Sequence, residues 1–465
     1  MRKKSWLAFS IERGSKTPVF EQICSEIRRQ AVSGELSQGA TLPPTRTLAA
    51  ELGVSRATIV TAYDQLVAEG YLEGRRGSGH ILRPMGEVEL GETKSPNRIS
   101  STAEKPVYPV PFHPGQPDMR EFPHNAWART VSRVARTRPH ALLQGADPLG
   151  NMELRRAIAL HVAEWRGIEA TPEQIVITAG AGDGLELCLR TLCQPGQRIG
   201  LENPGYPPLR SFASALGLKP VSLCIDKQGA QLPERPGRIR LLVITPSHQF
   251  PLGGAMSPGR RLEFIRWAGQ HDAWIIEDDY DSEFRYAGRP IPAMTGFNPN
   301  SRTIYVGSFS KIFSNSLRLG YVVFPQSLVA GATKTLLGFG IKASHMPQPV
   351  LAEFMLGGEF YRHLRRMRRL YSERRNYLLR RLKDDFARFG SAVDHHAGMQ
   401  VGFHLIPEFR DADIAINARR QNLKIEALSE YCADDQNLNG LVLGYCAFNE
   451  DELERGLVGL RESFR

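Results

Sequence analysis

The chain has 465 residues, of which 42% are hydrophobic and 23% are charged, and its formal net charge is +10. This length and composition are typical of a globular protein of two or three domains. The positive charge favours a polyanionic partner without identifying one. No uninterrupted apolar run approaches the roughly 20 residues of a membrane span, and no apolar signal segment follows the basic start, so we expect a cytoplasmic protein that makes no use of a membrane. The six cysteines form no Cys-x-x-Cys pair and have no histidine pattern nearby, so neither a disulfide framework nor a metal site is indicated.

The chain changes character along its length. Residues 17–82 alternate helical patterns with short turn signals, and residues 84–111 lose this periodicity and become rich in Pro, Glu, Ser and Thr, as linkers do. From residue 112 onward, short β-branched runs alternate with helical stretches, which is typical of a mostly parallel sheet. The sequence therefore predicts a helical unit at 1–83 with its core at 17–82, a linker at 84–111 and a large α/β unit at 112–465.

A helix, a tight turn and a second helix are predicted at the centre of the first unit. The first helix is expected to begin near Thr45 and to stop at Gly53, and the second to begin after Ser55, whose hydroxyl can cap the free amides. One face of the second helix is apolar: Ile59, Tyr63, Leu66 and Val67. The other side carries polar residues, Arg56, Thr58 and Thr61 among them, which is how a recognition helix packs while it presents its outer face to DNA.

Residues 71–82 are expected to form two short strands around a basic glycine turn. Arg75 and Arg76 lie at the tip of this turn, where a wing can reach phosphates or the minor groove. Residues 1–83 hold 12 Lys or Arg against 8 Asp or Glu, so this unit carries +4 of the net charge.

In the large unit, Lys311 follows the apolar run at 303–306. A lysine that forms a Schiff base needs a fixed element, partial desolvation and neighbours that stabilise a phosphate. Ser308 and Ser310 offer hydroxyls, and Arg318 offers a forked donor suited to a phosphate.

Three further segments place polar groups at strand ends. A hydrophobic strand at 274–276 leads to Asp278 and Tyr280, at the edge where open α/β sheets bind ligands. A buried aspartate facing a pyridine nitrogen keeps it protonated. The small residues at 179–184 allow backbone amides at a helix start to approach a phosphate, and Tyr206 follows a tight turn from which it could stack on a ring.

Residues 18–82 resemble the winged helix-turn-helix domain of the GntR family of bacterial transcription regulators, and residues 112–465 look like the fold type I aminotransferases. The stretches "GVSRATIVTAYDQLVAEGYL", "ENPGYPP", "TPSHQFPLG", "EDDYDSEFRY" and "FSKIFSNSLRLGY" are close to the pattern of the MocR/GabR subfamily, in which the two parts are joined. The resemblance implies an N-terminal winged helix-turn-helix followed by a large pyridoxal-phosphate-binding domain.

The resemblance also assigns roles to residues. The positions expected to contact operator DNA are Arg46, Ser55, Arg56, Thr58, Thr61, Arg76 and Gly77. Lys311 would hold pyridoxal 5'-phosphate as a Schiff base, Asp278 would pair with the ring nitrogen and Tyr280 would bond the O3 oxygen. The other residues expected around the cofactor are Tyr206, Ala181, Gly182, Ser308, Ser310 and Arg318.

The sequence departs from the family pattern at several positions. Val442 stands where an arginine commonly forks onto a substrate carboxylate. Relatives that sense γ-aminobutyrate also have an arginine shortly after the stacking tyrosine, where this chain has Pro207-Pro208, so that effector is not expected. Gly182 replaces a frequent glutamine, and Gln144-Gly145 stands where a tyrosine often reaches the partner's phosphate. These last changes predict a weaker cofactor affinity than usual.

We therefore expect a homodimeric, pyridoxal-phosphate-dependent regulator in which a small amine or amino-acid-like effector, or the cofactor itself, alters the binding of double-stranded operator DNA. Two alternatives stay open: a catalytically active aminotransferase with a DNA-binding tether, and an aminotransferase shell used only for dimerisation. An arginine-rich helical stretch at 361–375 is either a solvated face or a surface that guides DNA.

Overall fold

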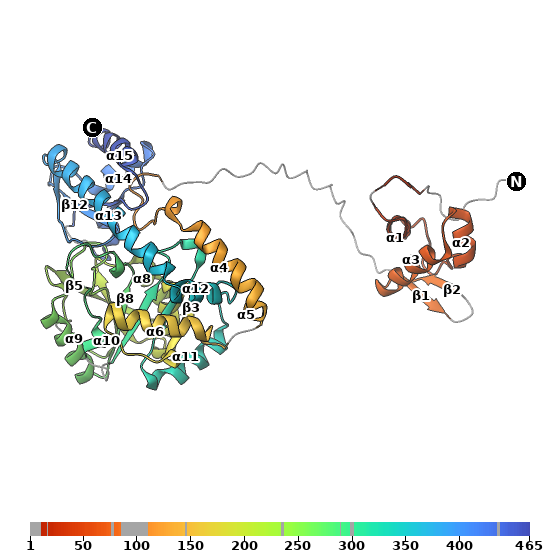
Figure 1. The fold of residues 1–465 in the computed structure, drawn as a ribbon, viewed down its shortest axis with the longest axis horizontal. Coiled ribbons are helices and arrows are strands. Elements are labelled where there is room, and N and C mark those ends of the chain that lie inside the picture. The colour runs from red at the N-terminus through yellow and green to blue at the C-terminus, as the bar shows by residue number, and fades with distance from the viewer. Residues whose placement is uncertain are drawn as a thin grey trace. The chain divides into compact units, whose positions relative to one another are not determined.

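The computed structural model describes residues 11–15, 17–75, 79–84, 110–144, 147–233, 237–288, 290–297, 302–434 and 438–465. The chain divides into two compact units, Met1–Lys105 and Pro106–Arg465 (Figure 1). Most of the predicted linker, together with Arg76, Gly77 and Gly145, lies outside the described residues. The predicted domain boundaries stay predictions.

The N-terminal unit is a helical bundle with a two-stranded ribbon. Its elements are α1 (Val19–Val32), α2 (Thr45–Leu52), α3 (Arg56–Ala68), β1 (Leu72–Arg75) and β2 (Gly79–Leu82). The predicted turn between the two central helices is confirmed: α2 ends at Gly53, which adopts the left-handed φ of 65°, and the Ser55 side chain accepts a hydrogen bond from the backbone N–H of Thr58. The two strands pair antiparallel, as expected of a wing.

The inner face of α3 holds this unit together. Ile59, Tyr63 and Leu66 are fully buried, and the Tyr63 hydroxyl donates to the carbonyl of Pro43 at 3.0 Å. The expectation for Val67 was wrong, because its side chain is 38% exposed. Ala62, one turn before Leu66, takes the remaining inner position, and Val67 points past the edge of the core.

The large unit is built on an eight-stranded sheet in the described part of the chain. Its strands are β3 (Ile175–Thr178), β4 (Arg198–Asn203), β5 (Lys219–Asp226), β6 (Gly229–Ala230), β7 (Ile239–Ile244), β8 (Trp274–Asp279), β9 (Thr303–Ser308) and β10 (Gly320–Val323). The order is β3-β10-β9-β8-β7-β4-β5-β6, with β5, β4, β7, β8 and β9 parallel and β10 antiparallel to both its neighbours. The mostly parallel sheet is as predicted.

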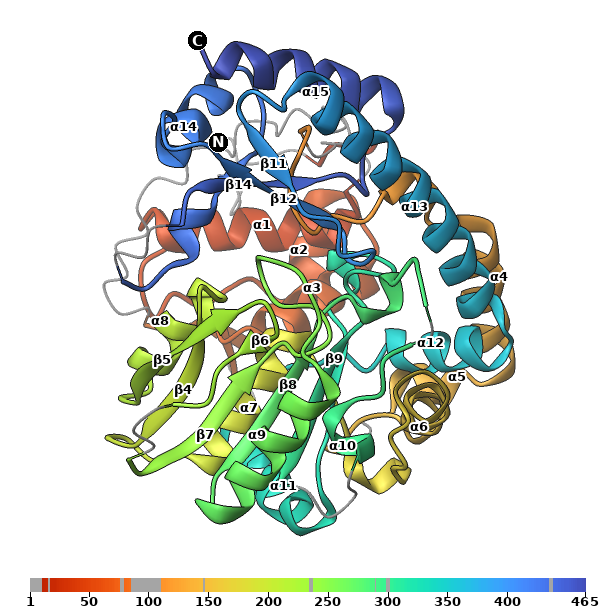
Figure 2. The ribbon, with the colours of Figure 1, turned by 90° about the vertical axis from the view of Figure 1, so that its left-hand side faces the viewer.

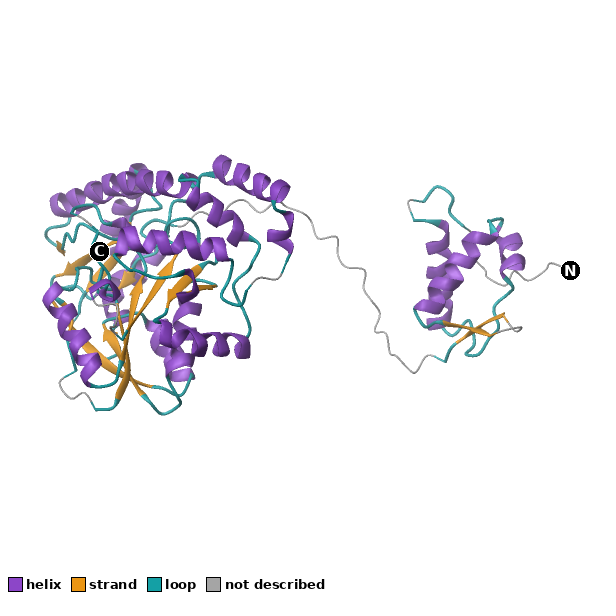
Figure 3. Cartoon of the chain, turned by 60° about the horizontal axis from the view of Figure 1, so that its bottom comes forward, coloured by secondary structure: helices purple, strands orange, loops and turns teal. Residues whose placement is uncertain are grey.

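Helices cover both faces of this sheet, and Figure 3 shows the strands in orange between helices in purple. One face carries α7 (Ala181–Leu192), α8 (Pro207–Ala215) and α11 (Gln326–Phe339). The other carries α6 (Met152–Arg166), α9 (Pro258–Gln270), α10 (Met294–Phe297) and α12 (Pro347–Leu356). Alternate residues of β7 pack against the helices of opposite faces: Leu241 and Val243 on one face, Leu242 and Ile244 on the other. Because both faces are buried, the strand is a continuous apolar run.

A smaller antiparallel sheet, in the order β11-β12-β14-β13, completes the unit and lies above the large sheet in the view of Figure 2. Its strands are β11 (Gly390–Ala392), β12 (Gln400–Leu405), β13 (Glu426–Ala427) and β14 (Gly440–Gly444). It is accompanied by α13 (Glu359–Asp385), α14 (Asp411–Arg420) and α15 (Glu450–Ser463); α4 (His124–Thr137) and α5 (Pro139–Leu143) precede α6. Phe112 is fully buried, and its carbonyl accepts a hydrogen bond from the N–H of Gly444.

The arginine-rich stretch forms part of α13. Two of its arginines, Arg374 and Arg375, are buried and therefore belong to neither a solvated face nor a surface that guides DNA. Arg374 forms an ion pair with Asp118 at 2.9 Å, and Arg375 pairs with Asp394. Arg365 and Arg369 are exposed, and their contact with DNA stays a prediction. No helix in the described part of the chain has the length and apolar character needed to cross a membrane.

Candidate functional site

A cavity of about 770 Å³ opens at the carboxyl ends of the parallel strands of the large sheet. All nine residues expected around the cofactor line it: Ala181, Gly182, Tyr206, Asp278, Tyr280, Ser308, Ser310, Lys311 and Arg318. They come from five segments of chain between residues 181 and 318, and the sheet brings them together because the carboxyl ends of parallel strands meet at one edge.

Lys311 lies in the loop that follows β9. Its Nζ donates a hydrogen bond to the carbonyl oxygen of Gly115 at 2.8 Å. Gly115 has a φ of 61°, and a Cβ at this position would lie 2.8 Å from Nζ, so the close approach requires glycine. Burial lowers the pKa of Lys311, because the charged ammonium loses its hydration. A larger fraction of this lysine is therefore the neutral, nucleophilic amine.

Two consecutive carboxylates at the end of β8 point to opposite faces of the sheet. Asp279 accepts from the hydroxyl of Tyr305 at 2.6 Å and pairs with Arg166 at 2.9 Å inside the core. Asp278 lines the cavity instead, and its buried Oδ1 has no hydrogen-bond partner among the described residues. Burial, and secondarily the charges of Asp279 and other nearby acids, raises the pKa of Asp278 to about 7. A buried acceptor without a partner is costly, so this oxygen is suited to a donor on a ligand.

Tyr280 is part of a polar chain beside Asp278. Its hydroxyl lies 2.9 Å from Nδ1 of His248, which in turn lies 3.0 Å from both carboxylate oxygens of Asp281. Burial raises the pKa of Tyr280 well above its usual range. Gly398, with a φ of 88°, leaves room for the imidazole, since a Cβ there would lie 2.1 Å from Cε1 of His248. The chain holds the Tyr280 hydroxyl in place at the cavity wall.

The start of α7 supplies a second polar end of the cavity. Its N-cap is Gly180, which has a φ of 101° and offers no side-chain cap, so the first amides of the helix are open to an anion. A Cβ at Gly320 would lie 2.7 Å from the Gly180 carbonyl carbon, so glycine is needed for this close approach of β10. Arg318 has no carboxylate partner among the described residues, and Ser308 accepts from the backbone N–H of Ser310 at 3.1 Å.

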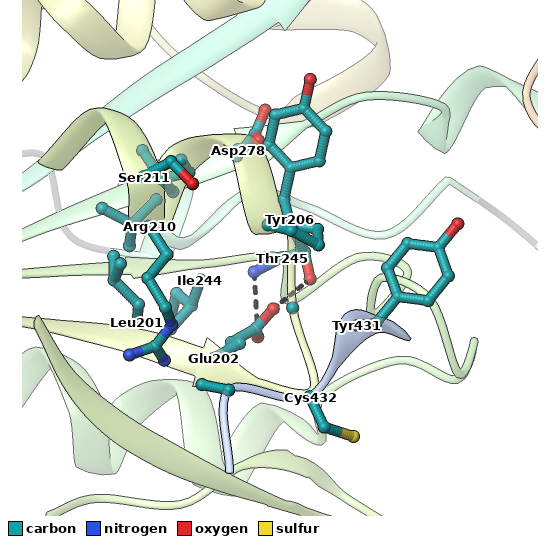
Figure 4. A pocket seen from close by; sticks show the side chains of 15 residues that line it. Leu201, Glu202, Tyr206, Arg210, Ser211, Ile244, Thr245, Asp278, Tyr431 and Cys432 are labelled. Atoms are coloured by element: carbon teal, nitrogen blue, oxygen red, sulfur yellow. Dashed lines mark hydrogen bonds between the residues drawn. The ribbon is translucent and has the colours of Figure 1, made fainter. Parts of the chain in front are cut away.

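Tyr206 separates this cavity from a smaller one of about 140 Å³, which Figure 4 shows. Its side chain is 47% exposed, and its ring meets Phe250 edge to face at 5.9 Å. In the smaller cavity, Glu202 accepts from the backbone N–H of Thr245 at 3.1 Å and from its hydroxyl at 2.5 Å. Burial raises the pKa of Glu202 to about 7.

Several residues of the large cavity were not found from the sequence. They are Gly115, Met399, Gln400, Glu426 and Tyr431, together with Asp281, which contacts His248. Most belong to the small sheet or to the entry of the large unit, and no motif connects them to Lys311. The only available signal was the Pro114-Gly115 pair directly after the predicted linker.

The departures from the family pattern have structural counterparts. Val442 is fully buried on β14, where it packs with Leu428 and Tyr431. Pro207 and Pro208 form the first turn of α8. A Cβ at Gly182 would meet nothing within 4 Å, so the position has open space in front of it.

The predicted DNA-contacting residues that are described lie on the exposed side of the N-terminal unit. Arg46 and Arg56 are exposed, and neither has a carboxylate partner among the described residues. Arg56 Nε donates to the Thr45 hydroxyl at 3.4 Å, the Ser55 and Thr58 hydroxyls are 2.8 Å apart, and the Thr61 hydroxyl donates to the carbonyl of its own helix at Ala57. Two arginines of the turn region are therefore open to a polyanion.

Comparison with protein families gives two matches. The profile described as "Aminotransferase class I and II" matches residues 115–428, and that of "Bacterial regulatory proteins, gntR family" matches residues 20–81. The first covers more than half of the chain and the second coincides with α1 to β2.

Full-length relatives combine the same two parts. The "Probable rhizopine catabolism regulatory protein MocR" of Rhizobium meliloti is 34% identical over 470 residues, which are 98% of this chain and 95% of the relative. The "HTH-type pyridoxine biosynthesis transcriptional regulator PdxR" of Corynebacterium glutamicum is 36% identical over 461 residues, 96% of each.

Among solved structures, the kynurenine aminotransferase of Pyrococcus horikoshii superposes with a TM-score of 0.70. The two chains are 20% identical, and the match covers 77% of this chain and 92% of the other. At this identity the likeness shows the fold alone. The prediction of a large fold type I aminotransferase-like domain is confirmed.

Proposed function

Because this chain belongs to the MocR/GabR subfamily of GntR-family transcriptional regulators, we propose that pyridoxal 5'-phosphate and an amine effector, bound in the large cavity, control its binding to operator DNA. The class of protein itself follows from the family: a DNA-binding transcription regulator with an aminotransferase-like domain. The effector, the homodimer and the residue roles below are parts of the proposal, as is its place in the bacterial cytoplasm.

The cavity residues fit this cofactor. The unpartnered Oδ1 of Asp278 is suited to the protonated pyridine nitrogen, and pairing with that cation would lower the raised pKa of the carboxyl group. The Tyr280 hydroxyl, held by His248, would donate to the phenolic oxygen, and Tyr206 would lie along the ring. When bound, the cofactor supplies an aldehyde carbon that reacts with primary amines and a ring that withdraws electrons.

The phosphate would take the opposite end of the cavity. The open amides at the start of α7, the Ser308 and Ser310 hydroxyls and the Arg318 guanidinium offer it neutral and charged donors. Lys311, with its pKa lowered by burial, would present a neutral amine to the aldehyde carbon of the cofactor once its bond to the Gly115 carbonyl is given up. A primary amine of the effector would compete with Lys311 for the same carbon.

Regulation requires that the effector bind two states of the large unit differently. In a homodimer, a change of state in the large units would alter the spacing of the two DNA-binding heads, and paired operator half-sites respond to that spacing. The Arg46 and Arg56 side chains would contact DNA, with Ser55, Thr58 and Thr61 beside them. Operator affinity would thereby report on occupancy of the cavity.

The observation that carries the proposal is a desolvated lysine and an unpartnered buried aspartate in one cavity, in a chain that also carries a winged helix-turn-helix. The test is the visible absorption spectrum of the full chain with pyridoxal 5'-phosphate, beside that of Lys311→Ala. We expect a visible band in the wild type that is lost in the variant and is shifted by one class of amines. Operator affinity, measured by fluorescence anisotropy, should change with the same amines.

The alternatives predict other results. Steady accumulation of a keto product with turnover of the amine would identify a working aminotransferase that has a DNA tether. A wild-type spectrum identical to that of Lys311→Ala would refute the cofactor site and leave dimerisation as the role of the large unit.

A further inference from the structure

The charges that line the large cavity are mostly engaged by one another or by the proposed cofactor. Lys342 pairs with Glu186 at 2.5 Å and with Asp183 at 3.4 Å. Asp281 is held by His248 at 3.0 Å. Asp278, Lys311 and Arg318 are the groups assigned to the ring nitrogen, the aldehyde and the phosphate.

Glu426 is the carboxylate that remains. It lines the cavity from β13 and is only partly buried. Of the residues that the structure describes, only the Tyr431 hydroxyl bonds to it, and no described arginine or lysine lies within ion-pairing distance. Its charge is close enough to oppose the effect of burial on Lys311 and on His113. The Glu426 carboxylate can therefore accept further hydrogen bonds from a ligand in the cavity, since a carboxylate can accept about four.

Register in the small sheet makes this position informative. Glu426 pairs directly with Val442 across β13 and β14, so the two side chains lie on the same face. Val442 stands where relatives commonly carry an arginine for a substrate carboxylate. In this chain Val442 is apolar, fully buried and not among the residues that line the cavity, whereas its cross-strand neighbour Glu426 lines the cavity as a carboxylate. An effector with a carboxylate end would meet repulsion at Glu426, and one with a cationic end would meet a partner.

We propose that the effector of this chain is a primary amine with a second cationic group, of the α,ω-diamine class, and that Glu426 binds that second group. The inference rests on the proposed function, because the first amine is the one that reacts at the cofactor. Tyr431 positions the Glu426 carboxylate, and Tyr431 and Phe250, whose ring centroids are 5.2 Å apart, are in position to pack against the methylene chain.

The experiment uses three amines of the same chain length: butylamine, γ-aminobutyrate and diaminobutane. Each is titrated into the full chain loaded with pyridoxal 5'-phosphate, and apparent affinity is read from the visible band and from operator anisotropy. Wild type is compared with Glu426→Gln, because the ratio between the two proteins cancels the intrinsic reactivity of each amine. The matched control is Glu430→Gln, an exposed glutamate that pairs with Arg419 and does not line the cavity.

In Glu426→Gln, we expect the affinity for diaminobutane to fall about tenfold, that for butylamine to stay within about twofold and that for γ-aminobutyrate to rise, since a charge-assisted hydrogen bond is lost and a repulsion is relieved. Glu430→Gln should behave as wild type. An equal change for all three amines, or none, would overturn the inference.

The wild-type ranking is a second, variant-independent test. Binding of γ-aminobutyrate at or above that of diaminobutane overturns the role of Glu426 while the proposed function stands, because the band still responds to amines. Failure of every amine to alter either the band or operator affinity refutes the proposed function itself, and the diamine inference with it.

Discussion

The two functional regions of this chain are built in different ways. The residues predicted to contact DNA, among them Arg46, Arg56 and Thr58, fall within one helix-turn-helix, are exposed or partly so, and bond mainly to close sequence neighbours. The cavity residues extend from Gly115 to Tyr431, and several are buried carboxyl, amino or hydroxyl groups with shifted pKa values. Recognition of a polyanion needs charges displayed by a local scaffold, whereas chemistry at an amine needs desolvation, which only distant segments can supply together.

The largest effect should be seen in the pH dependence of the stability of the large unit, because buried carboxyl groups such as Glu202 have shifted pKa values. Burial raises the pKa of Glu202 from 4.5 to about 7 in the folded state. The folded protein therefore holds a proton that the unfolded chain releases, and the resulting stability, about 3 kcal/mol, is present below pH 4.5 and lost as the pH rises to about 7. In calorimetry of the cofactor-free chain, this contribution should appear as the difference in pH dependence between the wild type and Glu202→Gln, because the other titrating groups of the large unit are common to both.

Glu202→Gln should show a smaller fall over the same window, because the amide does not titrate. The exposed Glu408, changed to Gln, provides the control and should keep the wild-type slope. An unaltered slope in Glu202→Gln would mean that this carboxyl group is not desolvated in solution.

The second effect concerns cofactor binding. Asp278→Asn removes the charge that would pair with the ring nitrogen, and loss of one partner of a buried charge pair should weaken binding of pyridoxal 5'-phosphate by about thirtyfold or more. Spectroscopic titration measures this loss, and anisotropy of the cofactor-free protein should show unchanged operator affinity. The exposed Asp384, changed to Asn, is the matched control. Unchanged cofactor affinity in Asp278→Asn would contradict the assignment of this residue.

The third effect is a loss of operator binding without a loss of cofactor binding, and it is confined to the N-terminal unit. Arg56→Ala should lower operator affinity about tenfold, because an exposed guanidinium contact to DNA is lost, and should leave the cofactor spectrum unchanged. The control is Arg29→Ala, because Arg29 is also an exposed arginine of this unit but forms ion pairs with Glu26 of α1 and with Glu35. If Arg29→Ala and Arg56→Ala weaken operator binding equally, the recognition face is misplaced.

The smallest effect tests the local scaffold itself. Ser55→Ala removes the side-chain cap of α3 and should destabilise the N-terminal unit by about 1 kcal/mol. Its calorimetric transition should shift down while that of the large unit stays in place. The exposed Ser37, changed to Ala, should shift neither transition. A shift of both transitions by Ser55→Ala would show that the two units do not unfold independently.

The two regions also differ in how far sequence reasoning reached. It placed the turn between α2 and α3 at Gly53 and Ser55, because a left-handed glycine and a capping hydroxyl are local requirements. It wrongly placed Val67 in the core, because the apolar face of α3 is wider than the surface that packs against it, and Val67 is exposed. It also treated the arginines of residues 361–375 alike, although Arg374 and Arg375 are buried and form ion pairs with Asp118 and Asp394.

The sequence by itself determined the mostly parallel sheet, the helix-turn-helix and the strand-end positions of Lys311, Asp278 and Tyr280, because periodicity, capping and motif spacing are properties of short segments. Only the tertiary structure decided that Oδ1 of Asp278 has no partner among the described residues, that Gly115 contacts Lys311, and that Glu426, the cross-strand neighbour of buried Val442, lines the cavity. Burial, pKa and charge complementarity arise between segments hundreds of residues apart, so they come into existence only when the chain has folded.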